Sequence, residues 1–238
     1  MEKDALFCSA VIVAAGSGKR MGADRPKQFL ELCSKTIIEH TAAVFSGCNA
    51  INEIIIVSSE DGIEECKRIF KESGFTADIK YVSGGKERYN SVYNGLMALD
   101  DRCDIVIIHD GVRPFVTEDI IRRSIDDAVT YGACAVGVKS KDTVKICDEK
   151  GFVVSTPVRD NVYNIQTPQT FKKYIIIDAY KKAFDIGVFG TDDAGVAENA
   201  GYPVKITEGS YDNIKITTPD DLIVGEKILT GGGGYKNS

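Results

Sequence analysis

Residues 11–28 read VIVAAGSGKRMGADRPKQ, an apolar run that ends at two alanines and continues into glycines and cations. The cations are Lys19, Arg20 and Lys27. Glycines let backbone N–H groups approach an anion closely, and neighbouring cations neutralise its charge. The stretch therefore predicts a phosphate-binding loop built on the end of a strand.

Other glycine-rich loops fit this stretch less well. Gly16, Gly18 and Gly22 do not have the spacing of the Gly-x-x-x-x-Gly-Lys-Ser/Thr loop. Met21 stands where the dinucleotide fingerprint needs its third glycine, and Pro26 interrupts the segment that would have to be a helix. A tight turn without a ligand is the remaining alternative, and Arg20 and the Pro-Lys-Gln run favour the functional interpretation.

The composition is that of a globular protein, and the net charge gives no reason to expect nucleic acid as a ligand. The chain has 238 residues, of which 43% are hydrophobic and 27% charged, and its net charge of −6 gives no basic field for nucleic acid. Its apolar runs are too short to cross a membrane. The seven cysteines are scattered and form no Cys-x-x-Cys pair. We therefore expect a cytoplasmic protein that binds neither nucleic acid nor membrane.

Apolar runs alternate with amphipathic stretches along most of the chain. Strands are predicted at residues 7–14, 53–57, 79–82, 105–109, 134–138, 203–207 and 214–217, and helices at 36–45, 63–73, 90–99, 117–131, 172–184, 193–199 and from 219 to about 229. This alternation predicts an α/β fold with a Rossmann-like, mostly parallel sheet and helices on both faces.

One segment breaks the alternation. Within residues 139–159, two β-rich runs flank the turn sequence Asp-Glu-Lys-Gly, which predicts a protruding β-hairpin arm. An apolar hairpin needs cover, so the arm favours a homodimer, and a hairpin packed on its own domain is the alternative. We expect a single domain over residues 1–230 that includes this arm, followed by a flexible tail at 231–238.

Two further motifs follow predicted strands. Residues 84–91 read GGKERYNS, where paired glycines let a planar base lie against the backbone, although a turn before a polar helix start explains them equally. Residues 109–114 read HDGVRP at the end of the most apolar strand, where ligands of open α/β sheets bind. Asp110 suits a hydroxyl or a metal and Arg113 a phosphate, and a structural salt bridge between them is the alternative.

These three motifs together resemble the family of cytidylyltransferases that act on 2-C-methyl-D-erythritol 4-phosphate in the non-mevalonate isoprenoid pathway. The resemblance spans about residues 7–229. It departs from the family pattern at Gly111-Val112 and at Pro157-Val158. It implies transfer of CMP from CTP to a polyol phosphate with release of pyrophosphate, and an arm that swaps across a homodimer.

The resemblance also implies a role for individual residues. Arg20 and Lys27, which the loop already singles out, would bind the triphosphate and stabilise the transition state, while Arg159 (on the partner's site) and Lys215 would hold the acceptor phosphate. Predicted nucleotide-binding residues are Ala14, Ala15, Gly16, Gly18, Gly85, Lys86, Ser91, Asp110 and Gly111. Predicted acceptor-binding residues are Asp110, Arg113, Thr143, Arg159, Thr167, Thr191 and Lys215. No metal ligand is firmly assigned, and Mg²⁺ is expected on the CTP phosphates.

Such a reaction needs no side-chain nucleophile, because the attacking phosphate is already an anion. The alternatives are transfer of CMP to ribitol 5-phosphate by a related enzyme, a catalytically silent nucleotide-binding module, and an NAD-dependent oxidoreductase. The runs KDTVK at 141–145 and GGKERYNSVY at 84–93 favour the isoprenoid enzyme over the ribitol enzyme.

Overall fold

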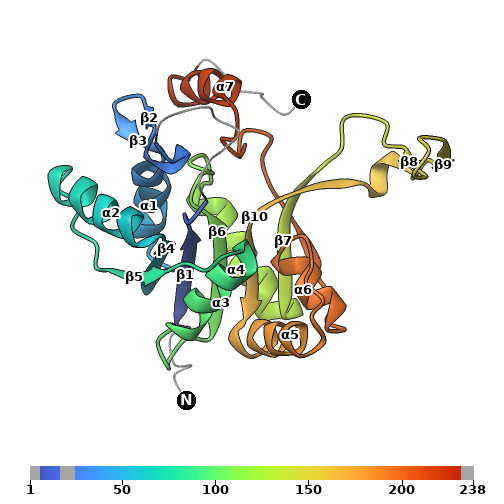
Figure 1. The fold of residues 1–238 in the computed structure, drawn as a ribbon, viewed down its shortest axis with the longest axis horizontal. Coiled ribbons are helices and arrows are strands. Elements are labelled where there is room, and N and C mark those ends of the chain that lie inside the picture. The colour runs from blue at the N-terminus through green and yellow to red at the C-terminus, as the bar shows by residue number, and fades with distance from the viewer. Residues whose placement is uncertain (1–5, 17–24, 232–238) are drawn as a thin grey trace.

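A computed structural model describes residues 6–16 and 25–231, and a seven-stranded sheet forms its centre (Figure 1). The strand order is β11-β7-β10-β6-β1-β4-β5, and only β10 runs antiparallel to its neighbours β6 and β7. The strands are β1 (Cys8–Val13), β4 (Glu53–Ser58), β5 (Ile79–Ser83), β6 (Ile105–Asp110), β7 (Ala133–Lys139), β10 (Tyr163–Lys172) and β11 (Lys205–Glu208). The predicted mostly parallel sheet is thus confirmed.

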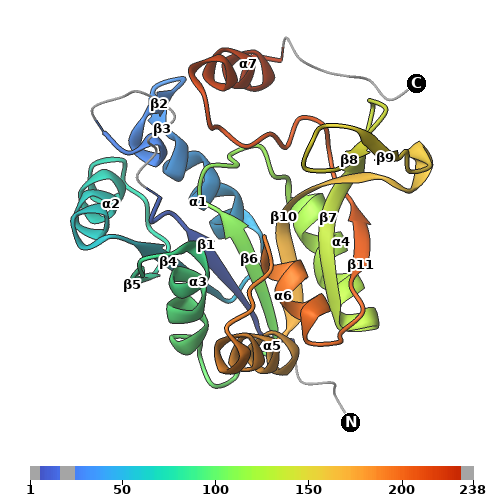
Figure 2. The same cartoon turned by 45° about the vertical axis from the view of Figure 1, so that its right-hand side comes forward.

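Helices cover both faces because alternate strand residues point to opposite sides. Ala10 and Ile12 pack in one cluster with α1 (Ile37–Gly47), α2 (Glu60–Glu72) and α4 (Glu118–Tyr131). Val11 packs in the opposite cluster with α3 (Arg88–Met97), α5 (Lys173–Ile186) and α6 (Asp193–Asn199), which lie along one face in Figure 2. Each fully buried aliphatic side chain contributes about 2 kcal/mol to this packing.

The last helix, α7 (Pro219–Leu229), begins as its sequence predicts. Thr218 and Asp221 form a reciprocal capping box, with Pro219 at the first helical position. Leu222 and Ile228 pack near a small cluster that contains Phe115. α7 therefore lies over the carboxyl end of the sheet, beside the loop that follows β6 (Figure 1).

Two local predictions differ from the structure. Residues 214–217 were expected to be a strand, but they pair through one bond, from Ile216 N–H to the carbonyl of Val112, while Ile214 and Ile216 pack into the cluster under α7. No local pattern predicts the strand β10, which contains Pro168. The pairing of β10 with β7 shifts between Ile165 and Gln169, so the proline lies where the ladder is already interrupted.

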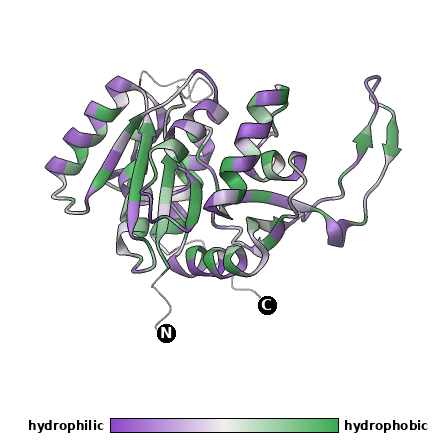
Figure 3. Cartoon of the chain, turned by 90° about the horizontal axis from the view of Figure 1, so that it is seen from below, coloured by the Kyte–Doolittle hydropathy of each residue, from purple (hydrophilic) through white to green (hydrophobic). Residues whose placement is uncertain are grey.

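The arm leaves the body between β7 and β10 (Figure 1). Its strands β8 (Ile146–Cys147) and β9 (Val153–Ser155) pair antiparallel. Both strands are largely green, the colour of hydrophobic residues, in Figure 3. Phe152 and Val154 are 71% and 67% exposed. In the described residues, no helix has the length and apolarity needed to span a membrane. The predicted tail lies outside the described residues from 232 onward.

Candidate active site

A cavity of about 400 Å³ opens at the carboxyl ends of β1 and β6. This is where ligands bind in open α/β sheets. It gathers predicted residues from four segments of the chain: Ala14, Ala15, Gly16, Lys27, Gly85, Lys86, Ser91, Asp110 and Lys215. A second cavity of about 500 Å³, between β7 and β11 at the base of the arm, contains none of the predicted site residues.

The end of the first strand and the run Pro-Lys-Gln at residues 26–28 are joined by a hydrogen bond. The amide of Gln28 donates from Nε2 to the carbonyl of Ala14 at 2.6 Å, and the Ser58 hydroxyl donates to the same carbonyl at 3.1 Å. Lys27 opens a 3-10 helix, Lys27–Phe29, directly after Pro26. The two ends of the glycine-rich stretch therefore lie together, and Lys27 lines the cavity beside the end of β1.

Close backbone approach explains two of the glycines. A Cβ on Gly84 would stand 2.8 Å from the Cβ of Ala15 and 2.9 Å from the Ser91 hydroxyl, so only glycine fits. The Ser91 hydroxyl accepts a hydrogen bond from the N–H of Gly85 at 3.0 Å. Gly111 likewise lies against Ala14, and its N–H donates to the carbonyl of Val13. The predicted nucleotide segments thus pack directly on the end of β1.

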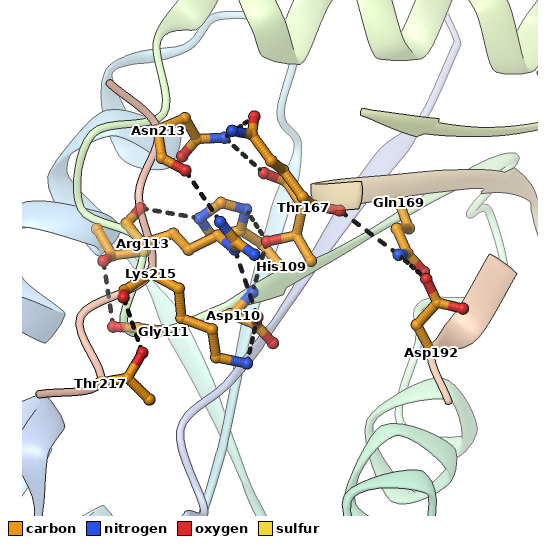
Figure 4. A network of polar contacts seen from close by, with 12 residues as sticks. His109, Asp110, Gly111, Arg113, Thr167, Gln169, Asp192, Asn213, Lys215 and Thr217 are labelled. Carbon is orange, nitrogen blue, oxygen red and sulfur yellow. Dashed lines mark hydrogen bonds and ion pairs between the residues drawn. The ribbon is translucent and has the colours of Figure 1, made fainter. Parts of the chain in front are cut away.

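Asp110 carries the densest charge cluster of the cavity (Figure 4). Its Oδ2 lies 2.8 Å from Lys215 Nζ and 3.5 Å from Arg113 Nε, and its Oδ1 lies 3.5 Å from an Arg88 nitrogen. Burial alone would raise the pKa of Asp110, but the charges of Arg88, Lys215 and Arg113 outweigh it and hold that pKa well below its usual range. Asp110 is therefore a fixed anion.

A hydrogen-bond chain behind Asp110 fixes the loop that follows β6. The carbonyl of Arg113 can only accept, so His109 donates to it from Nε2 at 3.1 Å and is left with Nδ1 as an acceptor. Nδ1 accepts from the Thr167 hydroxyl at 3.0 Å, and that hydroxyl accepts from the N–H of Asp110 at 3.1 Å. Burial lowers the pKa of His109 to about 4, so this imidazole is neutral. These contacts give His109 a structural role at the end of β6.

Several predicted residues lie elsewhere. Thr167 is 4% exposed and its hydroxyl is engaged behind Asp110, and Arg113 contacts Asp110 and the carbonyl of Asn213. Thr143 and Arg159 are exposed on the arm, and Thr191 is exposed in the loop before α6. Their side chains do not line the cavity. Gly18 and Arg20 lie outside the described residues.

Sequence reasoning missed two charged residues. Arg88 lines the cavity and lies 2.7 Å from Asp193 Oδ2, and the Asp193 side chain is completely buried. Arg88 stands within the quoted segment 84–91 and Asp193 two residues after the predicted Thr191, but an ion pair between such distant positions has no signature in a single sequence. The signal that could have found Arg88 is its place in the glycine-containing run 84–91, which was already a candidate ligand loop.

The cavity offers cations in place of metal ligands. In residues 6–16 and 25–231, no group of three or more His, Cys, Asp or Glu side chains is placed to hold a metal ion. Asp110, the buried carboxylate of the lining, is already surrounded by three cations. Cys33 and Cys147, the exposed cysteines of this part of the chain, do not line the cavity. The chemistry this arrangement supports is the binding and alignment of phosphates.

Sequence comparison identifies close relatives of the chain. The family model for 2-C-methyl-D-erythritol 4-phosphate cytidylyltransferase matches residues 8–231. A protein of that name from Clostridium botulinum (strain 657 / Type Ba4) is 51% identical over 93% of this chain and 96% of its own length. Another, from Alkaliphilus metalliredigens, is 48% identical over 93% of this chain and 92% of its own length.

Solved structures agree with the sequence comparison. The crystal structure of 4-diphosphocytidyl-2C-methyl-D-erythritol synthase from Anaerococcus prevotii superposes with a TM-score of 0.86 at 39% identity, covering 95% of this chain and all of that one. The enzyme from Thermus thermophilus gives a TM-score of 0.75 at 27% identity over 94% of this chain and all of its own. With the family model matching nearly the whole length, the chain belongs to the 2-C-methyl-D-erythritol 4-phosphate cytidylyltransferase family.

Proposed function

We propose that this protein transfers CMP from CTP to 2-C-methyl-D-erythritol 4-phosphate and releases pyrophosphate, a step of isoprenoid biosynthesis. Membership of the family supports the activity. The observation that carries it in the structure is the placement of Lys215 and Arg88 around Asp110, with Lys27 lining the same cavity, at the ends of β1 and β6.

The reaction joins two anions. A phosphate oxygen of the acceptor attacks the α-phosphorus of CTP, the bond from that phosphorus to the bridging oxygen breaks, and pyrophosphate leaves. The acceptor oxygen carries no proton that a base must remove at neutral pH. The protein has to screen the two phosphates from each other and hold them in line. The cations around Asp110 and Asp193 outnumber these carboxylates by one, and Lys27 adds a further positive charge to the lining.

We assign the two ends of the cavity to the two substrates. Gly85, Lys86 and Ser91 would contact the cytidine base through a narrow pocket and backbone hydrogen bonds, and Asp110 and Gly111 the ribose. Lys27, together with Arg20, would bind the triphosphate. Lys215 would hold the acceptor phosphate, and the exposure of Thr191 beside α6 suits a contact with the acceptor's hydroxyls.

Magnesium would enter with the nucleotide. Mg²⁺ keeps several waters and binds through few carboxylates together with substrate phosphates. The described side chains offer no cluster of ligands for it, so the triphosphate oxygens would be its main ligands. In that position the ion neutralises the charge of the leaving pyrophosphate.

The arm would complete the site in a homodimer located in the cytoplasm. Phe152 and Val154 gain cover if the arm packs on a second copy, and such burial contributes about 2 kcal/mol for each large apolar side chain. The arm extends away from the body of the subunit (Figure 1), and Thr143 and Arg159, which belong to it, do not line the cavity of their own subunit. We propose that the partner subunit's Arg159 reaches the acceptor phosphate.

A coupled assay of pyrophosphate release tests the activity. Purified protein is given CTP and Mg²⁺ with either 2-C-methyl-D-erythritol 4-phosphate or ribitol 5-phosphate. We expect rapid turnover with the first acceptor. Turnover with ribitol 5-phosphate alone would assign the related activity, and CTP binding without turnover on either acceptor would indicate a silent module. Tight binding of NADH would support the oxidoreductase alternative.

A further inference from the structure

One ion pair joins the loop that lines the cavity after β5 to the loop that precedes α6. Arg88 is the first residue of α3 and follows the loop that carries Gly85 and Lys86. Asp193 is the first residue of α6 and follows the loop that carries Thr191. A guanidinium nitrogen of Arg88 lies 2.7 Å from Asp193 Oδ2. The proposed nucleotide side and acceptor side are thus in direct contact.

Asp193 is held on both of its oxygens. Its side chain has no exposed surface, and its Oδ1 accepts a hydrogen bond from the hydroxyl of Tyr180 at 2.6 Å. Burial, and next the neighbouring carboxylate of Asp193, raise the pKa of Tyr180 well above its usual value, so Tyr180 keeps its proton and donates. A buried carboxylate tolerates the loss of a partner poorly. Asp193 therefore fixes the position of the Arg88 guanidinium.

Hydrogen bonds with Gln169 on β10 also hold the loop before α6 in place. Gln169 on β10 donates to Asp192 Oδ2 at 2.7 Å and accepts from the N–H of Ala194 at 2.8 Å. Asp192 also accepts from the N–H of Gly195 and caps α6. The position of this loop is therefore set by the sheet, and Arg88 is the side chain that relates it to the cavity.

Arg88 extends the connection to Asp110. The nitrogen that contacts Asp193 also lies 3.5 Å from Asp110 Oδ1, while Asp110 Oδ2 contacts Lys215. The arginine side chain lines the cavity and is 33% exposed. A continuous line of polar contacts thus runs from Tyr180 through Asp193, Arg88 and Asp110 to Lys215, across the floor of the site.

We infer that Arg88 is a positioning residue that aligns the acceptor side of the site with the nucleotide side through Asp193. The inference rests on the proposed function, in which Lys215 and Thr191 meet the acceptor. A displacement of about 1 Å at a reacting centre lowers rates by about a hundredfold, so loss of this alignment is costly even when both substrates bind.

Two conservative variants test the inference by kinetics. Arg88→Lys keeps the charge but loses the planar fork, and Asp193→Asn keeps the shape and an acceptor for Tyr180 but loses the charge. For each we expect kcat/KM for the acceptor to fall at least about tenfold, with the KM for CTP changed by less than about twofold. The double variant should be no worse than the worse single one, because both break the same link. Arg122→Lys, in an exposed pair with Glu118 on α4, is the matched control.

Hydrogen exchange tests the link without turnover. In the wild-type protein, CTP should slow amide exchange in residues 188–192 by at least about twofold, although the nucleotide is assigned to the other of the two loops. In Arg88→Lys this slowing should disappear. The measurement holds whichever acceptor the enzyme uses, so a failure of the proposed reaction would be seen separately, as wild-type protein without turnover.

Four results would overturn the inference. A rise in the KM for CTP alone would make Arg88 a nucleotide ligand. Independent effects that multiply in the double variant would show that Arg88 does not act through Asp193. Melting temperatures that fall in step with activity, or exchange in residues 188–192 that responds to CTP equally in both proteins, would leave the pair a structural contact only.

Discussion

Lys215 Nζ lies 2.8 Å from Asp110 Oδ2, a contact between the segment before α7 and the end of β6. The Asp110 side chain is 9% exposed, and that of Lys215 is 36% exposed. The carboxylate is therefore buried and fixed, whereas the ammonium group reaches the open side of the cavity. Such a pair holds a flexible lysine in one place before any substrate arrives, so that little ordering remains to be done when a phosphate binds.

Lys215→Met should therefore impair the use of the acceptor. We expect kcat/KM for the acceptor to fall by about a hundredfold, the usual scale for losing one preorganised donor at a developing charge. The KM for CTP should change little, since Arg88 and Arg113 still compensate Asp110. Steady-state kinetics with each substrate varied in turn provide the measurement.

Lys182→Met is the control for the Lys215 substitution, because Lys182 pairs with Asp178 on the exposed side of α5. That variant should keep wild-type kinetics. If Lys215→Met raised the KM for CTP and left the acceptor unaffected, the assignment of Lys215 to the acceptor phosphate would be wrong.

Lys27→Ala should lower turnover far more than it lowers stability. Lys27 lines the cavity beside the end of β1, and we assign it to the triphosphate and the transition state. We expect kcat to fall by about a hundredfold or more, with a melting temperature near that of the wild type. Lys35→Ala, at an exposed position of β3 (Lys35–Thr36), is the matched control. A melting temperature that collapsed together with activity would leave the catalytic assignment without support.

Most of the sheet was predictable because the signals for its strands and for the helices between them lie within short stretches of sequence. β1, β4 and β6 are continuous apolar runs that are buried on both faces, and α4 begins after the capping residue Thr117; both features are visible in short windows of sequence. β10 was not predictable in this way. Its run YNIQTPQTFK is polar and contains Pro168, and it is held in place by neighbours on both sides that no local pattern reveals.

The site residues also differ in whether local sequence or only the tertiary fold reveals them. The paired glycines after a strand marked residues 84–91 as a candidate ligand loop, and the family resemblance then singled out Gly85, Lys86 and Ser91 within it. The contact of Arg88 with Asp193 and that of Gln28 with Ala14 depend on the tertiary fold, which brings distant segments together. Thr167 shows the reverse case. The resemblance assigned it to the acceptor, and in the structure its hydroxyl contacts His109 Nδ1 and the N–H of Asp110.

The lowered pKa of His109 predicts how the stability of the fold depends on pH. Its pKa is about 4 in the folded protein because the imidazole is buried, against 6.5 for an ordinary histidine. Between these values the unfolded chain binds the proton more readily, so stability falls as the pH drops from 6.5 toward 4. The loss should be roughly 3 kcal/mol across this window. Urea unfolding at pH 7, 6, 5 and 4.5 measures it.

His109→Gln provides the comparison, since it removes the titrating group at the same buried position. The variant should be less stable at pH 7 but should show a much shallower decline toward pH 4.5. The low pKa of Asp110 acts only below the usual carboxylate range, so it does not obscure this window. An unchanged slope in the variant would show that other groups cause the decline.

Mixed dimers should recover activity if the arm completes the partner's site. Arg159 lies on the arm, in the 3-10 helix Arg159–Asn161, whereas Lys27 lines the cavity of its own subunit. A Lys27→Ala subunit paired with an Arg159→Ala subunit forms one site with both substitutions and one with neither. Two differently tagged chains, purified together through both tags, should therefore regain about half of wild-type activity per dimer, while either homodimer stays impaired. Verified heterodimers as inactive as the homodimers would mean that each subunit uses its own Arg159.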